Sequence, residues 1–197
     1  VHTEPILFIL DHKQLPSAED CFECFQPPLY YLSSAFFATV IMSFTSNEIV
    51  IWKSIQFLSV LFSIFTLLVI WLVLKKLFST TKTRLIVFSL AIFLPRNIYM
   101  SSLISNDGLS YLLATLFFYF IVRYMKEHNA SLLLVASLFS IVGLLTKSTL
   151  FFLVPILCLA VLFSRQKMFK KVKWISFYFL LLLVFVGPFL YHNHISY

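Results

Sequence analysis

The sequence predicts an all-α protein, a polytopic bundle of transmembrane helices with juxtamembrane helices on its outer face. Of its 197 residues 60% are hydrophobic and 12% are charged, whereas soluble domains carry roughly 25% charged residues. Several apolar runs approach or exceed the ~18–20 residues that a helix needs to cross a bilayer. These runs do not alternate with period two, as the strands of a membrane barrel do. A large soluble core and a β-barrel are therefore both excluded.

The net charge of +7 follows membrane topology and does not indicate nucleic-acid binding. Residues 75–84, 123–128 and 164–173 hold eleven of the fifteen Lys and Arg residues, and basic loops stay on the cytoplasmic side of a membrane. With these loops inside, seven of the eight acidic residues lie outside. We therefore expect a multi-pass integral protein of the plasma or inner membrane, or of the endoplasmic reticulum, with no nucleic-acid partner.

Two regions are expected along the chain. Residues 1–46 form an outer loop with juxtamembrane helices, and 28–46 either lies along the outer interface or crosses the membrane. The interfacial alternative keeps the acidic opening loop outside. Residues 47–197 form the transmembrane bundle, with spans at about 54–74, 85–104, 106–125, 131–145, 149–163 and 174–191. The fourth and fifth spans reach only about 22 Å at ~1.5 Å per residue, short of a ~30 Å hydrocarbon core.

Cys21 and Cys24 form a CxxC pair. Zinc would need a second pair of ligands, and the sequence offers no Cys or His pair nearby. A loop disulfide or two ordinary thiols are the favoured alternatives, and no metal site is predicted. The chain starts without an initiator methionine or a signal peptide, so we expect a piece that is truncated at both ends.

Candidate site residues concentrate at the corners on the outer side. Asn106 and Asp107 open a helix, where an acid either caps the helix N-terminus or combines the cap with a functional role. Lys147 lies between the two short spans and is followed by Ser148, at a helix start whose free N–H groups attract anions. The lysine either binds a phosphate there or extends to the membrane interface.

Arg96, directly after Pro95, and Lys53 could add positive charge to this group. Acids and cations on the outer side suit a reaction of a lipid-linked phosphate. A carboxylate can accept the proton of an acceptor hydroxyl, and cations can stabilise the departing phosphate. Transporters also bury such residues, so a lipid or solute transporter or a non-catalytic membrane assembly subunit is the alternative.

The chain resembles the GT-C superfamily of polytopic glycosyltransferases, in particular the branch of dolichyl-phosphate-mannose–protein mannosyltransferases and aminoarabinose-transferase-like enzymes. Four passages carry the resemblance, in this order: QPPLYY at 26–31, SNDG at 105–108, GLLTKS at 143–148 and NHISY at 193–197. They resemble that group's PPLYY element, its polar Asn/Asp corner, its Gly-x-x-x-Thr-Lys hinge and its Arg-Asn…Tyr passage. The resemblance covers nearly the whole chain.

The resemblance implies a polyprenyl- or dolichyl-phosphate sugar donor, an inverting transfer and an outer or lumenal active side. The acceptor would be a protein, a lipid or a glycan. Asp107 would orient donor or acceptor in a supporting catalytic role, and Lys147 with Ser148 would bind the phosphate. Residues 26–31, Gln26 and Tyr30 among them, would shape the site wall. No cofactor is predicted, and the need for a divalent metal stays open.

The sequence departs from the family pattern in three respects. His2 resembles the histidine that follows the family's catalytic acid, so that acid is expected just before Val1. Lys53 stands where the family has an arginine, and His192 replaces the arginine that precedes Asn193.

Overall fold

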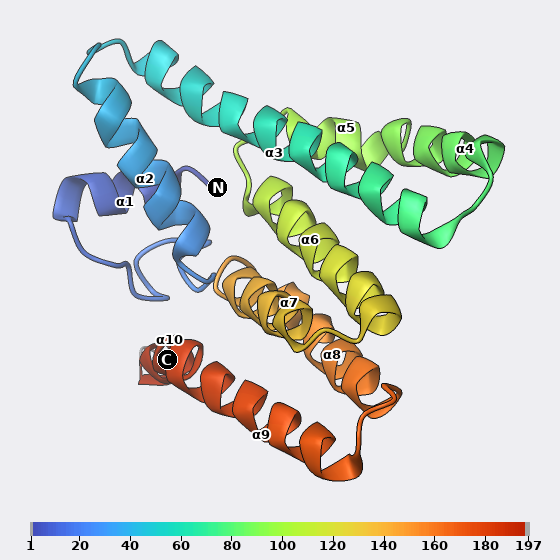
Figure 1. Cartoon of the computed structure of the whole chain (residues 1–197). Helices are drawn as coiled ribbons and strands as arrows, with labels where there is room; N and C mark the ends of the chain where they lie inside the picture. The colour runs from blue at the N-terminus through green and yellow to red at the C-terminus, as the bar shows by residue number, and fades with distance from the viewer. Residues whose placement is uncertain (1, 196–197) are drawn as a thin grey trace.

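The structure is a computed structural model that describes residues 2–195, with side chains up to Asn193. Within this range the chain is helical and contains no strand, which confirms the predicted all-α class (Figure 1). The helices are α1 (Glu4–His12), α2 (Leu29–Met42), α3 (Glu48–Leu77), α4 (Thr81–Ile92), α5 (Pro95–Ser101), α6 (Asn106–Glu127), α7 (Ala130–Leu144), the 3-10 helix η1 (Ser148–Phe152), α8 (Leu153–Leu162), α9 (Met168–Phe185) and α10 (Gly187–Ile195).

Helices α3 and α6 are each long and apolar enough to cross a membrane. The Asn47 side chain caps α3 by accepting a hydrogen bond from Ile49 N at 3.0 Å, and Lys75 and Lys76 lie in its last turn. An amide acceptor at the start and cations at the end both suit the helix dipole. Helices α9 and α10 form a third candidate span if they are taken together, with a bend of 44° between them.

The expected span over 85–104 is divided into α4 and α5. The division falls at Phe93 and Leu94, directly before Pro95. Proline disfavours helical backbone in the residue that precedes it and cannot donate its own backbone hydrogen bond. The region 28–46 contains the single helix α2. The first of the two expected short spans corresponds to α7. The second corresponds to η1 and α8, which together form a continuous apolar helix over Ser148–Leu162.

Two apolar clusters hold the helices together. Tyr30, Tyr31 and Ala35 of α2 pack with Ile6 of α1 and Ile55 of α3. The second cluster joins α6, α7, α8 and α9 through fully buried side chains such as Phe117, Leu133, Leu153 and Tyr178. The Tyr178 hydroxyl is hydrogen-bonded to Ser140 Oγ at 2.6 Å. A polar pair thus ties α9 to α7 inside an apolar core.

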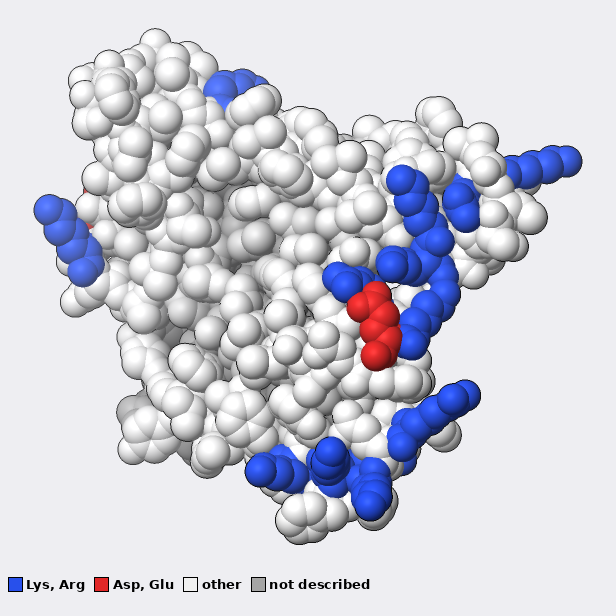
Figure 2. All heavy atoms as spheres, viewed as in Figure 1, with Lys and Arg blue, Asp and Glu red and all other residues white. Residues whose placement is uncertain are grey.

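The two ends of the bundle differ in charge. The connections α3–α4, α6–α7 and α8–α9 lie at one end, on the right and at the lower right of Figure 1. Figure 2 shows Lys and Arg gathered there around a small acidic patch. Lys76 and Glu127 join the ends of α3 and α6 at 3.7 Å. The helix α1, the α7–η1 turn and α10 lie at the other end.

Candidate functional site

An ion pair between Asp107 and Lys147 joins the start of α6 to the α7–η1 turn. Lys147 Nζ donates to Asp107 Oδ1 at 2.8 Å. Ser105, the N-cap of α6, accepts from Asp107 N at 3.2 Å and donates to Asp107 Oδ2 at 2.9 Å. Serine is a preferred N-cap because its oxygen satisfies a free helix N–H. Both oxygens of the Asp107 carboxylate are therefore occupied within the chain.

The turn that carries Lys147 is tight. Thr146 N and Lys147 N both donate to Gly143 O at 2.9 Å. A Cβ atom at Gly143 would lie 3.0 Å from Leu150 Cδ1, closer than side chains normally pack. The absence of a side chain at Gly143 leaves room for Leu150 of η1 to pack against the end of α7.

The pair is largely removed from solvent. The Lys147 and Asp107 side chains are 17% and 10% exposed. Burial of two charges costs free energy that their attraction and hydrogen bonds must offset. An ammonium has three donors, and one of them is used by Asp107. The arrangement therefore holds a partly desolvated cation in place while other donors can still bind an anion.

A series of amide hydrogen bonds connects this pair to the loop before α2. Gln26 Nε2 donates to Glu23 Oε2 at 2.7 Å, and Asn106 Nδ2 donates to Gln26 Oε1 at 3.1 Å. Asn106 Nδ2 also lies 3.4 Å from Thr146 O. An ionised carboxylate only accepts hydrogen bonds, so Glu23 requires the Gln26 amino group to face it. The Gln26 carbonyl oxygen then faces Asn106.

His2 lies beside the same charged groups. Its Nδ1 is 3.1 Å from the Tyr31 hydroxyl, and it interacts electrostatically with Glu23, Lys147 and Asp107. Burial lowers the pKa of His2 below its usual value of 6.5. The imidazole is therefore neutral at pH 7 and leaves Lys147 as the cation of this cluster.

Three further contacts hold the loop in place. A disulfide joins Cys21 to Cys24, so the disulfide alternative for the CxxC pair is the one the structure contains. Leu29 N donates to Leu145 O at 3.0 Å, which ties the start of α2 to the α7–η1 turn. Asn193 Nδ2 of α10 donates to Phe25 O at 2.8 Å.

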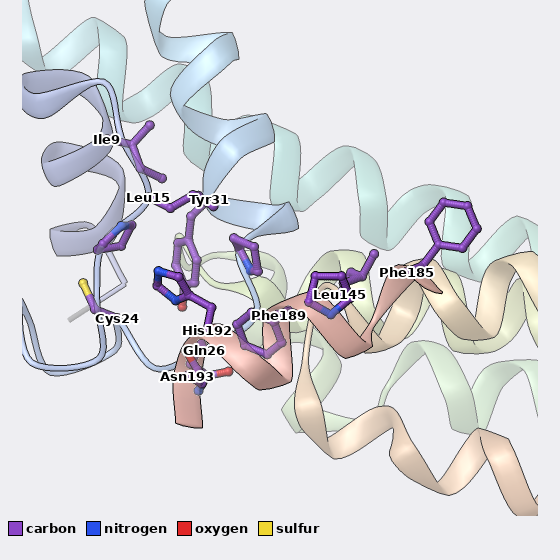
Figure 3. A pocket seen from close by; sticks show the side chains of 13 residues that line it. Ile9, Leu15, Cys24, Gln26, Tyr31, Leu145, Phe185, Phe189, His192 and Asn193 are labelled. Carbon is purple, nitrogen blue, oxygen red and sulfur yellow. The ribbon is translucent and has the colours of Figure 1, made fainter. Parts of the chain in front are cut away.

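An apolar pocket of about 330 Å³ lies beside this loop. Figure 3 shows residues of α1, of α2 and the loop before it, and of α10 around this space, among them Ile9, Tyr31 and His192. Gln26 and Tyr31 also contact Asn106 and His2 through the hydrogen bonds above. The pocket therefore adjoins the polar cluster and offers room for a ligand that is mainly apolar.

The structure brings together five of the predicted site residues: Asp107, Lys147, Asn106, Gln26 and His2. It places four others differently. Arg96 Nε donates to the Tyr111 hydroxyl at 3.0 Å and its charge acts on Asp107 from the exposed surface. Lys53 is exposed and donates to Gln56 at 2.9 Å. Ser148 is exposed at the start of η1. The Tyr30 ring is buried among α1, α2 and α3.

Sequence reasoning did not select Glu23, Ser105 or Asn193 as site residues. Glu23 lies three residues before Gln26 and between two cysteines, and this spacing was the signal that could have identified it. The contact of Asn193 with Phe25 spans 168 residues, and no local pattern predicts it. Among the described residues no group of three or more His, Cys, Asp or Glu side chains is placed to hold a metal ion.

Comparison with known proteins identifies the family. The model of the dolichyl-phosphate-mannose-protein mannosyltransferase family matches residues 26–192, a range that includes Gln26, Asn106, Asp107 and Lys147. Searches of curated proteins and of solved structures find no match to the chain. Because the family model covers most of the sequence, the chain belongs to the dolichyl-phosphate-mannose-protein mannosyltransferase family of GT-C-type membrane glycosyltransferases.

Proposed function

We propose that the cluster around Asp107 and Lys147 binds the phosphate of a polyprenyl- or dolichyl-phosphate sugar during transfer of the sugar. The observation that carries this proposal is the buried Lys147 ammonium, held at 2.8 Å by Asp107 within the range that the family model matches. A lysine in a partly dry site attracts a phosphate more strongly than one in water.

In this reaction an acceptor hydroxyl attacks the anomeric carbon and loses its proton to a carboxylate base, the new glycosidic bond forms, and the bond from carbon to phosphate oxygen breaks. Negative charge builds on the departing phosphate. Lys147 stabilises that charge with the N–H groups that Asp107 does not use, and this effect is larger in the transition state than in the ground state. Asp107 acts as a positioning residue for the ammonium.

The remaining members of the cluster shape the site. Asn106 and Gln26 hold the turn at Thr146 through the amide series. The hydrogen-bonded pair of His2 and Tyr31 forms the wall of the site next to Glu23. The neighbouring apolar pocket accommodates apolar parts of the substrates. The acceptor is a protein, lipid or glycan hydroxyl.

We further propose that the cluster faces the outer or lumenal side. Two observations support this orientation. Eleven of the fifteen Lys and Arg residues belong to the opposite, basic end, which positive-inside topology assigns to the cytoplasm. The Cys21–Cys24 disulfide lies beside the cluster, and disulfides persist in oxidising compartments.

Orientation can be measured with a membrane-impermeant thiol reagent. In a Cys24→Ser, Cys158→Ser background, Cys21 is the remaining cysteine of the sequence. We expect Cys21 to react in intact cells or sealed lumen-out vesicles. Reaction from the cytoplasmic side alone would reverse the proposed orientation.

The function itself is tested by Lys147→Ala in the full-length protein. We expect normal membrane insertion and a loss of sugar transfer of about 100-fold or more, as for removal of other transition-state donors. Lys53→Ala is the matched control, because Lys53 is exposed and contacts Gln56. Equal activity of Lys147→Ala and wild type would exclude the phosphate site.

A further inference from the structure

A second, larger pocket of about 630 Å³ lies at the basic end, beyond the C-terminal end of α6. Its walls come from the α6–α7 corner, from Gln166 in the α8–α9 connection, and from the first three turns of α9. The Asp107–Lys147 pair lies at the other end of the 22-residue α6. The transfer reaction proposed above therefore does not use this pocket.

Two lysines of the pocket wall are available to a ligand. Lys170 and Lys173 are exposed on α9, and within the described range neither lies within ion-pair distance of a carboxylate. The nearby acid, Glu127, is held by Arg123 at 2.8 Å and by Lys76 at 3.7 Å. Figure 2 shows the acidic patch in contact with basic side chains at this end. The pocket thus has a cationic rim that the chain itself does not neutralise.

Part of the pocket wall is aromatic. Trp174 and Phe177 follow the lysines along α9, with ring centroids 6.0 Å apart. Farther along the same helix Leu180 and Val184 are each 55% exposed. Tryptophan is enriched where a helix enters the apolar region from the membrane surface. A ligand bound at the lysines would therefore find an apolar surface that continues toward the bilayer.

Gln166 adds a polar atom with no partner. Its Oε1 is buried and accepts no hydrogen bond within the described structure. Buried polar atoms are normally hydrogen-bonded, and a carbonyl oxygen can only accept. A fitting ligand therefore combines a negative charge for the lysines with a donor group for Gln166.

We propose that this pocket binds an anionic glycerophospholipid with a hydroxylated head group, from the leaflet at the basic end. Lys170 and Lys173 bind the phosphodiester, and a head-group hydroxyl donates to Gln166 Oε1. The acyl chains lie along Trp174 and Phe177. Phosphatidylglycerol has these properties. Phosphatidylcholine has no net charge and no hydroxyl, and phosphatidylmethanol has the same singly charged phosphodiester without a hydroxyl in the head group.

The test is retention of lipid by the purified full-length protein, measured by native mass spectrometry with phosphatidylglycerol, phosphatidylcholine and phosphatidylmethanol offered at equal concentration. We expect phosphatidylglycerol to bind best. Lys170→Ala with Lys173→Ala should weaken its binding by about 30-fold, since each lysine near an anionic lipid contributes about fivefold in affinity. Conversion of both lysines to arginine should preserve binding.

Lys75→Ala with Lys82→Ala is the matched control, because it removes the same charge from the same end of the molecule but outside the pocket. If this variant lost as much affinity for phosphatidylglycerol, the lysines would act only by general electrostatic attraction, and the proposed site would be overturned. Gln166→Leu should lower the preference for phosphatidylglycerol over phosphatidylmethanol by about fivefold, the effect of one hydrogen bond. An unchanged preference would contradict the assigned role of Gln166.

Competition with free glycerol 3-phosphate distinguishes a lipid site from a site for a soluble anion. We expect the free compound not to displace phosphatidylglycerol at equal concentration, because it lacks the chains that cover Trp174 and Phe177. Displacement at equal concentration would overturn the lipid assignment. Each arm includes the melting temperature of the variant, so that loss of folding is recognised separately.

Discussion

Two ion pairs with the same separation lie at opposite ends of α6. Asp107 and Lys147 are 2.8 Å apart with side chains 10% and 17% exposed. Glu127 and Arg123 are also 2.8 Å apart, but their side chains are 37% and 30% exposed. The first pair joins residues 40 positions apart, and the second joins neighbouring turns of one helix.

The difference in burial changes what each pair contributes. Exposed pairs on a helix are screened by water and salt and contribute little to stability. A buried pair carries a desolvation cost, and well-packed apolar side chains are often as stable in its place. Stability alone therefore does not explain the Asp107–Lys147 pair. A role for Lys147 as the fixed cation of the proposed phosphate site would explain it.

The largest effect on stability is expected when one partner of the buried pair is removed. Lys147→Met leaves the Asp107 carboxylate buried without its cation, which typically costs about 3–5 kcal/mol. The melting temperature in detergent or nanodiscs measures this loss. A melting temperature equal to that of wild type would show that water reaches Asp107 freely, contrary to its low exposure.

The next largest effect, on sugar transfer, is expected when a change at Glu23 reverses the direction of hydrogen bonding in the amide series. Glu23→Lys places a donor against Gln26 and turns the amide so that two amino groups face each other at Asn106. We expect a loss of transfer of about tenfold, the effect of one hydrogen bond broken within a partly buried site.

Adding Gln26→Glu to Glu23→Lys should restore activity. The new carboxylate at position 26 accepts hydrogen bonds from the ammonium introduced at position 23 and from Asn106 Nδ2. Asn106 then again donates to an oxygen of residue 26, as in the wild type. The Michaelis constant for the lipid-phosphate donor and the turnover number are measured for both variants. If the second change brings no recovery, the series does not position the turn that carries Lys147.

A smaller effect concerns pH. Burial lowers the pKa of His2 from 6.5, so the unfolded chain binds the proton more readily than the folded chain. The contribution of His2 to the free energy of unfolding is therefore fully present above about pH 6.5, and it declines as the pH falls below that value. Thermal unfolding between about pH 5 and 8 measures this decline. His2→Asn should reduce it, and an identical profile for the variant would contradict the buried, neutral imidazole.

The smallest effect is expected at the exposed pair. Glu127→Gln removes the acid that contacts Arg123 and Lys76, and we expect no measurable change in melting temperature or in transfer. A clear loss of melting temperature or of transfer would show that the exposed pair matters as much as the buried one. This result would contradict the distinction drawn from their exposure.

Much of the fold follows from local chemistry. The length of the apolar runs predicts α3 and α6, the cap residues Ser105 and Asn106 predict the start of α6, and the basic loops predict which connections share an end. The division between α4 and α5 was missed, although Pro95 was visible, because proline is tolerated in membrane helices when neighbouring groups satisfy the backbone.

The site was predicted less completely, for a physical reason. Asp107 and Lys147 were selected separately from their positions at helix ends, but their pairing depends on how α6 and α7 pack. The same holds for Gln26, whose orientation is set by Glu23 on one side and Asn106 on the other. Arg96 was selected for its charge, and Lys53 for its charge and its place in the family pattern. Neither determines which way a surface side chain extends.

The most direct measurement of the central claim is sugar transfer from a lipid-phosphate donor by the double variant Asp107→Asn, Lys147→Met. Removal of both charges together avoids a lone buried ion, so we expect a melting temperature near that of wild type. Because the phosphate then has no cation at this position, we expect transfer to fall by about 100-fold or more. A stable double variant that transfers sugar at the wild-type rate would contradict the account.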